Sequence, residues 1–242
     1  MIRLFTTDSL ALGADVPLTE AQTHYLLHVM RQKAGAELTL FNGQDGAWTA
    51  TLTTLTKKNG MARVHTQTQA QPSARPCILC PALIKKEPMD WLLQKATELG
   101  ATEIRPMLTQ RTVVNRLNRG RAQAIVIEAA EQCERLIVPH VFDPQPLAEV
   151  LRNLPRDVQV IYLHERSTAP LPKIPATASV AFLIGPEGGF TPDEFELMAR
   201  HPNAAALHLP GTILRAETAA LAALSCWQFR VFEAGHPPQS AR

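Results

Sequence analysis

Two glycine-bearing segments near the end of the 242-residue chain decide the fold. They read LIGPEGGF over residues 183–190 and LPGTILRAETA over residues 209–219. Each has the pattern of a short strand that runs into a loop and then into a helix. Two such strand–loop–helix segments place both loops at the carboxyl edge of one parallel sheet, which is where open α/β sheets bind ligands. We therefore expect a ligand site at this edge.

The first loop leads into a well-defined helix start. Val180–Ile184 is a short apolar run typical of a fully buried strand. Gly188 and Gly189 permit backbone angles and a close ligand approach that side chains would prevent. Thr191 and Glu194 then form the pattern of a capping box, with a proline at the first helical position. A plain structural turn would show the same local pattern, so it is the pairing with the second loop that favours a ligand site.

A polar, proline-bearing segment at residues 69–76 divides the chain into two expected domains. Residues 1–70 show short strands with tight turns and one helix, which predicts a small β-barrel. Residues 77–242 alternate strands with helices, which predicts an α/β domain with a parallel sheet covered on both faces. The N-terminal strands are expected at 37–41, 47–55 and 61–67, with a helix from the Thr19 capping box to about residue 31. Later strands are expected at 77–84, 103–109, 158–164, 180–184 and 205–209, and later helices at 88–99, 118–134, 146–154, 191–200 and 214–229.

Composition and missing motifs exclude several classes of function. The residues are 45% hydrophobic and 19% charged with a net charge of +2, which is ordinary for a soluble globular protein. No apolar run is long enough to span a membrane, and four scattered cysteines suit a reduced, cytoplasmic protein. Cys77 and Cys80 lack further ligands and face opposite sides of an expected strand, so we expect buried thiols and no metal site. The glycine motifs of dinucleotide-binding, P-loop and α/β-hydrolase proteins are absent.

The two C-terminal loops together resemble the cofactor-binding signature of the SPOUT methyltransferases. The similarity is in detail to the family that methylates N3 of a uridine in small-subunit ribosomal RNA, and it covers nearly the whole chain. It extends through residues 94–101, 106–111, 128–135 and 163–166 and includes His24, Val29, Met30 and Arg31. The resemblance implies a SPOUT-type α/β domain with a C-terminal trefoil knot, preceded by a PUA-like or OB-like barrel that binds RNA. It also implies S-adenosylmethionine as cofactor, 16S ribosomal RNA of the small subunit as substrate, and a homodimer that uses the alanine-rich helix after Leu214.

The resemblance also implies the site residues. The cofactor is expected to contact Leu163, Ile184, Gly185, Pro186, Glu187, Gly188, Leu209, Gly211, Ile213, Leu214 and Thr218. RNA contacts are expected from Arg31, Lys33, Lys85, Lys86, Arg111, Arg135 and Arg166.

The chemistry of the substrate points to Arg215. Uridine N3 carries a proton at neutral pH and must lose it before the nitrogen can attack a methyl group. A cation beside O2 or O4 would stabilise the developing negative charge, and Arg215 is the candidate. The base could be Glu187, Glu217 or water.

The second loop departs from the family pattern, which usually reads Leu-Gly-x-Arg-Ile-Leu-Arg. Pro210 replaces the glycine and Thr212 replaces the first arginine. A non-catalytic RNA-binding or ribosome-assembly factor of the same fold is therefore an alternative. Methylation of another RNA is a further one.

Overall fold

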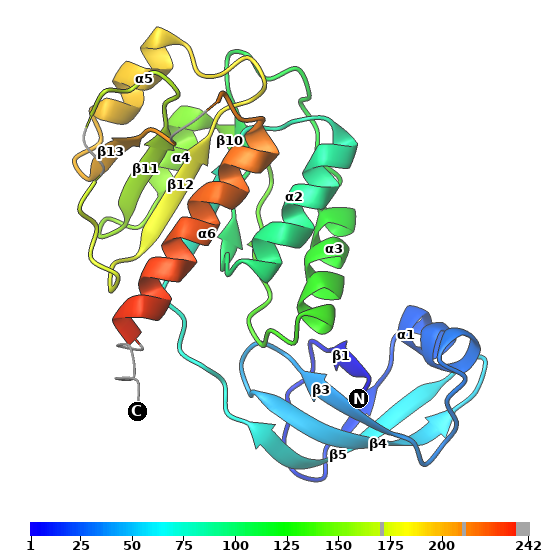
Figure 1. The fold of residues 1–242 in the computed structure, drawn as a ribbon. Helices are drawn as coiled ribbons and strands as arrows, with labels where there is room; N and C mark the ends of the chain where they lie inside the picture. Colours follow the sequence, from blue (N-terminus) through cyan, green and yellow to red (C-terminus); the bar gives the residue numbers. More distant parts are fainter. Residues whose placement is uncertain (170–171, 210–211, 236–242) are drawn as a thin grey trace. The chain divides into compact units, whose positions relative to one another are not determined.

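The chain divides into two compact units, one of residues 1–73 and 130–138 and the other of residues 74–129 and 139–242. The computed structural model describes residues 1–169, 172–209 and 212–235 (Figure 1). Residues 130–138 join the N-terminal unit because Ala130 and Leu136 are buried in one cluster with Phe41 and Ala47. The expected division into 1–70 and 77–242 did not include this return of the chain.

The N-terminal unit is built on a five-stranded sheet. The strand order is β1 (Arg3–Phe5), β3 (Glu37–Phe41), β4 (Ala47–Leu55), β5 (Gly60–Gln69) and β2 (Asp15–Pro17). β1 pairs with β3 in parallel, and the other neighbours are antiparallel. The alternating pattern of β3 and β4 directs Leu38, Leu40 and Leu52 into a buried core.

The helix of the N-terminal unit begins as expected and ends differently. In α1 (Glu20–His24), Thr19 and Gln22 form the capping box, with the Thr19 side chain accepting from the Gln22 N–H at 3.2 Å. The chain then widens into a π-helical turn, η1 (Tyr25–Val29), so a single α-helix to about residue 31 is wrong for the last turns. Arg31 follows at φ +53°, a left-handed conformation that is costly for a residue with a side chain.

The second unit contains the expected parallel sheet. Its order is β13 (Ala204–Leu207), β11 (Gln159–Leu163), β12 (Val180–Ile184), β6 (Cys77–Pro81), β7 (Glu103–Ile104) and β9 (His140–Val141). All neighbouring pairs are parallel, and β12 is buried along its whole length. The chain therefore has the α/β class that the alternation of strands and helices predicts.

Helices cover both faces of this sheet (Figure 1). They are α2 (Lys86–Glu98), α4 (Leu147–Asn153), α5 (Pro192–Ala199) and α6 (Ala216–Gly235). A further helix, α3 (Arg119–Gln132), lies beside α2, where Arg121 pairs with Asp90. Residues of α4 and α5 pack with Ile78, Cys80 and Leu183 on one face. On the other, α6 packs against β6 and β12, and α2 packs against α6. Gly100, at φ +96°, follows α2 in the left-handed conformation expected after a helix end.

Two expected strands are shorter in the structure. The strand expected at 103–109 is broken at Arg105 and Pro106, and β8 (Met107–Leu108) pairs instead with β10 (Gln145–Pro146) in a separate two-stranded sheet. The strand expected at 77–84 ends at Pro81. Proline lacks the N–H that a sheet ladder needs, which accounts for the break at Pro106. Pro81 is still paired with Ile184, and the Ala82 N–H after it donates to the Ile184 carbonyl at 2.8 Å, so β6 ends where its partner β12 ends.

Three further expectations concern burial, membranes and the knot. Cys77 and Cys80 are buried, and burial raises the pKa of the Cys80 thiol to about 12, so that thiol stays protonated at neutral pH. No helix in the described ranges is long and apolar enough to cross a membrane, and no cluster of metal-ligating side chains occurs in them. The knot stays a prediction, since Pro210 and Gly211 lie outside the described residues.

Candidate cofactor site

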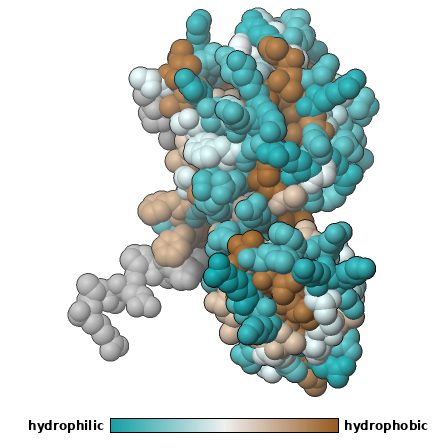
Figure 2. Space-filling model, turned by 90° about the vertical axis from the view of Figure 1, so that its right-hand side faces the viewer, coloured by the Kyte–Doolittle hydropathy of each residue, from teal (hydrophilic) through white to brown (hydrophobic). Residues whose placement is uncertain are grey.

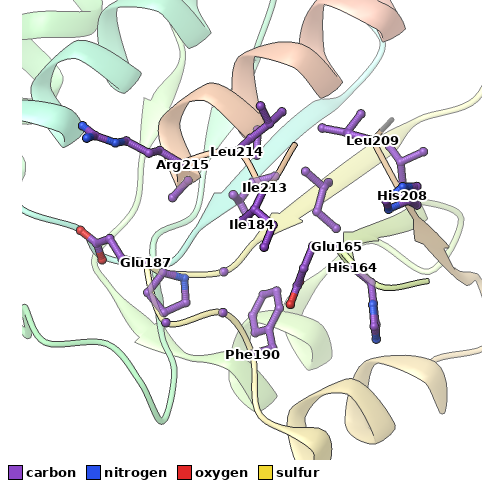
Figure 3. A pocket seen from close by; sticks show the side chains of 18 of the residues that line it. His164, Glu165, Ile184, Glu187, Phe190, His208, Leu209, Ile213, Leu214 and Arg215 are labelled. Carbon is purple, nitrogen blue, oxygen red and sulfur yellow. The ribbon is translucent and has the colours of Figure 1, made fainter. Parts of the chain in front are cut away.

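A cavity of 390 Å³ lies at the carboxyl edge of the sheet, where β11, β12 and β13 end (Figure 3). β12 and β13 flank β11, so the loops after these two strands approach each other across the end of β11. The volume falls in the range of small-molecule sites. The lining residues are Leu163, His164, Glu165, residues 184–190, Leu207, His208, Leu209, residues 212–216 and Ala219.

Most of the residues expected to hold a cofactor line this cavity. Those that do are Leu163, Ile184, Gly185, Pro186, Glu187, Gly188, Leu209, Ile213 and Leu214. Thr218 is exposed on α6 and is not among the lining residues. Gly211 lies outside the described residues. The structure thus brings both glycine-bearing segments to one cavity.

The loop after β12 turns sharply because of its glycines. The Gly189 N–H donates to the Pro186 carbonyl at 2.8 Å, and Gly189 has φ +68°. A Cβ on Gly185 would lie 3.2 Å from Cδ2 of Phe190, a distance that real side chains rarely show. Phe190 therefore folds back over the glycine and closes one side of the cavity.

The turn of residues 109–112 holds this loop and the start of α5 by hydrogen bonds. Arg111 donates from Nη1 to the carbonyl of Gly188 at 2.7 Å and to that of Phe190 at 3.4 Å. Glu194, only 5% exposed, accepts from the N–H of Gln110 at 2.7 Å and from that of Thr191 at 2.9 Å. One buried carboxylate thus completes the expected capping box of α5 and ties it to the segment after β8.

Several lining residues were not expected from the sequence. His208 has a buried Nδ1 atom that finds no partner in the described part of the chain, so a ligand group would satisfy it. His164 stacks against Phe195 with ring centroids 4.0 Å apart, and Glu165 follows it. His164 and His208 directly follow the ends of β11 and β13, with Glu165 one residue further, and that position was the available signal.

Arg215 and Glu187, the expected catalytic pair, both line the cavity and are both exposed. Figure 3 shows them on one side of the view and His164 and His208 on the other. Arg215 immediately precedes α6 and forms no ion pair with Glu187 or Glu217 within the described ranges. Its guanidinium is therefore available to a ligand. Glu217 does not line the cavity, which favours Glu187 of the two carboxylates as the one beside it.

The residues expected to contact RNA fall in both units. Arg31 and Lys33 are exposed in the N-terminal unit, where Arg135 is half-buried. Lys85, Lys86, Arg111 and Arg166 are exposed in the second unit. Lys85 and Lys86 lie at the start of α2, beside the end of β6. RNA binding by these residues stays a prediction.

The fold and the cavity define an RNA methyltransferase. The family model for the RNA methyltransferase domain matches residues 71–228, and that for the RNA methyltransferase PUA domain matches residues 18–61. The chain belongs to the family of ribosomal RNA small subunit methyltransferase E. The protein of this name from Rickettsia conorii is 32% identical over 92% of this chain and 93% of its own. That from Synechocystis is 33% identical over 92% of this chain and 76% of its own.

The solved structures that share this fold include two with a bound cofactor. Ribosomal RNA small subunit methyltransferase E from Neisseria gonorrhoeae, bound to S-adenosyl methionine, is 32% identical with a TM-score of 0.86 and covers 95% of this chain and 97% of its own. A Legionella pneumophila protein in complex with the bound cofactor SAM is 31% identical with a TM-score of 0.84, over 94% and 97%. The family and the α/β fold with an N-terminal PUA domain are thereby confirmed.

Proposed function

We propose that this chain methylates N3 of a uridine in the 16S ribosomal RNA of the small subunit, with S-adenosylmethionine as methyl donor. The cavity at the carboxyl edge carries the proposal, because both glycine-bearing segments line it together with Arg215 and Glu187. S-adenosylmethionine supplies an electrophilic methyl group when it is bound. Neither alternative, a non-catalytic factor or another RNA substrate, is favoured by the relatives of this chain.

The residues of the cavity fit this cofactor. Ile184, Leu209 and Ile213 offer apolar surface for an adenine ring. Gly188 lines the cavity with its backbone, and the orphaned Nδ1 of His208 offers one hydrogen bond to a polar edge. Holding two reactants in a fixed geometry is the main task of an enzyme that transfers a group without a covalent intermediate.

The charged residues of the cavity suit the chemistry at uridine N3. The Arg215 guanidinium can donate two parallel hydrogen bonds to a carbonyl edge and keeps its charge at all relevant pH values. Placed at O2 or O4, it stabilises the negative charge that develops as N3 loses its proton. Glu187, which lines the cavity on the same side of the view as Arg215, is our candidate to take that proton directly or through water; Glu165 is a second carboxylate in the lining. The target base must leave its stack to reach the cavity.

Mass spectrometry of ribosomal RNA nucleosides tests the proposed function. Small subunits from cells that lack the chain are incubated with the purified protein and S-adenosylmethionine. We expect N3-methyluridine to appear in 16S RNA only when both are present. Methylation of a transfer RNA, or cofactor binding with no methylated nucleoside in any RNA, would contradict the proposal.

Arg31 is expected to contact an RNA phosphate. Its side chain is exposed, and its left-handed backbone is one that asparagine tolerates, so Arg31→Asn removes the charge without adding strain. The variant should lower the salt slope of RNA affinity by about one unit. Filter binding over a range of salt concentrations measures this slope. Lys57→Asn removes an equal charge from the exposed β4–β5 turn, and an identical change in both variants would mean that only net charge matters.

A homodimer in the cytoplasm completes the proposal. Ala220 and Ala223 of α6 are already buried in their own subunit, so the alanine-rich face is not wholly available to a partner. Phe229 on the same helix is 62% exposed. Separately, the side of the molecule drawn in Figure 2 is mainly hydrophilic, with hydrophobic side chains between the hydrophilic ones. Light scattering at micromolar concentration should give twice the 26.6 kDa mass of the chain. A monomer at that concentration would refute the dimer.

A further inference from the structure

We infer that Arg111 is a positioning residue, which holds the loop of residues 186–190 in the conformation that accepts the cofactor. The inference rests on the proposed function, since it concerns the affinity for S-adenosylmethionine. The resemblance instead implies that Arg111 contacts RNA. A positioning role predicts that loss of Arg111 weakens cofactor binding, whereas an RNA contact predicts that it weakens RNA binding and leaves cofactor binding unchanged.

The first observation is the pair of hydrogen bonds from Nη1 of Arg111. They reach the carbonyls of Gly188 and Phe190 at 2.7 and 3.4 Å, on either side of the left-handed Gly189. A charged donor makes a stronger hydrogen bond than a neutral one. The guanidinium thus holds two carbonyls in the second half of the segment between β12 and α5, which runs from Gly185 to Thr191.

The second observation is packing at Gly188. A Cβ built on this glycine would lie 3.4 Å from both Cβ and Cδ of Arg111. The aliphatic stem of Arg111 therefore covers the glycine on one face, while the loop lines the cavity. Arg111 itself is not among the residues that line the cavity, so it acts through the loop and not on the ligand.

The third observation is that the base of Arg111 is itself fixed. The Thr112 N–H donates to the Thr109 carbonyl at 3.1 Å, and the Thr109 N–H donates to Oγ1 of Thr112 at 3.0 Å, so the turn is closed on itself. The N–H of Gln110 is bound to the buried Glu194, which also caps α5. Glu194 therefore connects the turn of residues 109–112 to α5, and Arg111 reaches from this turn to the loop that precedes α5.

The expected effect follows from the populations of loop conformations. Without the guanidinium, the loop keeps its glycines and loses the two bonds that restrict them. If the fraction of molecules whose loop is in the conformation that accepts the cofactor falls to about a tenth, the apparent affinity for the cofactor falls about tenfold. At saturating cofactor the loop is held by its ligand, so kcat should change little.

The experiment compares Arg111→Ala, Arg111→Lys and Arg116→Ala in the full-length chain. Arg116 is an exposed arginine five positions further on, with no hydrogen bond or ion pair to the described residues, so it is the matched control. Calorimetry with S-adenosylmethionine in the absence of RNA should show about tenfold weaker binding for Arg111→Ala. Arg111→Lys should fall between this variant and the parent because an ammonium reaches one carbonyl at a time. Arg116→Ala should bind the cofactor like the parent.

Two further measurements separate this role from the others. Steady-state kinetics should show a raised KM for S-adenosylmethionine with kcat nearly unchanged. If Arg111→Ala binds the cofactor as the parent does and loses RNA affinity instead, Arg111 is an RNA contact and the inference is wrong. Equal cofactor binding with a lower melting temperature would also overturn it, since the role would then be structural only. Binding by the parental chain tests the proposed function separately.

Discussion

Replacing Arg215 with alanine is expected to slow methyl transfer by about 10²–10³-fold, or roughly 2.7–4 kcal/mol in the barrier, by analogy with the loss of one oxyanion donor. Arg215 lines the cavity, and no carboxylate of the described chain pairs with it. Thr212 stands where the resemblance places the other arginine of this motif, so we expect Arg215 to carry the role alone. Single-turnover kinetics at saturating RNA and cofactor measure the chemical step directly.

A matched arginine controls for the loss of a surface charge. Arg200 pairs with Glu196 on α5 and does not line the cavity, so Arg200→Ala should methylate at the parental rate. Arg215→Lys should recover part of the rate, because it restores the charge but not the planar pair of donors. If Arg215→Ala reacts as fast as the parent and only melts earlier, Arg215 is structural and another cation must serve the reaction.

Replacing Gly188 with valine is expected to weaken S-adenosylmethionine binding by roughly tenfold or more, in line with an overpacking cost of about 1–3 kcal/mol. The branched side chain would extend beyond a Cβ position that already lies 3.4 Å from Arg111, and so would push the loop or the arginine away. Gly188 is exposed, so the fold should still unfold cooperatively. Calorimetry measures the affinity, and thermal unfolding without cofactor checks the fold.

Alanine at the same position is the control for this prediction. A single Cβ at 3.4 Å makes an ordinary van der Waals contact, and Gly188 does not adopt the positive φ seen at Gly189. Gly188→Ala should therefore bind S-adenosylmethionine nearly as the parent does. Parental affinity in the valine variant would remove Gly188 from the cofactor site.

The sequence predicts best what depends on neighbouring residues. The capping boxes at Thr19 and Thr191 and the left-handed Gly100 are set within one helical turn, and each lies where expected. The three-residue strands β1 and β2 carry too few side chains to show a period, and they exist because distant strands pair with them. Residues 103–109 likewise read as a single strand. In the structure, however, β7 pairs in the parallel sheet and β8 pairs with β10 in the two-stranded sheet, and the sequence of this segment does not show that division.

The candidate site divides in the same way. Both glycine-bearing segments could be placed at the cavity because parallel strands share a carboxyl edge. The bond from Arg111 to Gly188 could not, since it joins residues 77 positions apart and depends on how the turn after β8 docks. In the sequence, His208 is only a histidine that follows an expected strand. That its Nδ1 is buried without a partner in the described chain could not be predicted from the spacing of residues.

The return of residues 130–138 to the N-terminal unit limits how this protein can be dissected. Ala130 and Leu136 cover Phe41 and Ala47, and Glu131 accepts a hydrogen bond from the Phe5 N–H at 2.9 Å. A gene fragment that stops at Ser73 would encode this unit without residues 130–138, and Phe41 would be exposed to water. Such a fragment should be prone to aggregate. Recombination between relatives would meet the same obstacle, because a crossover near residue 73 separates the unit from a piece encoded more than fifty codons later.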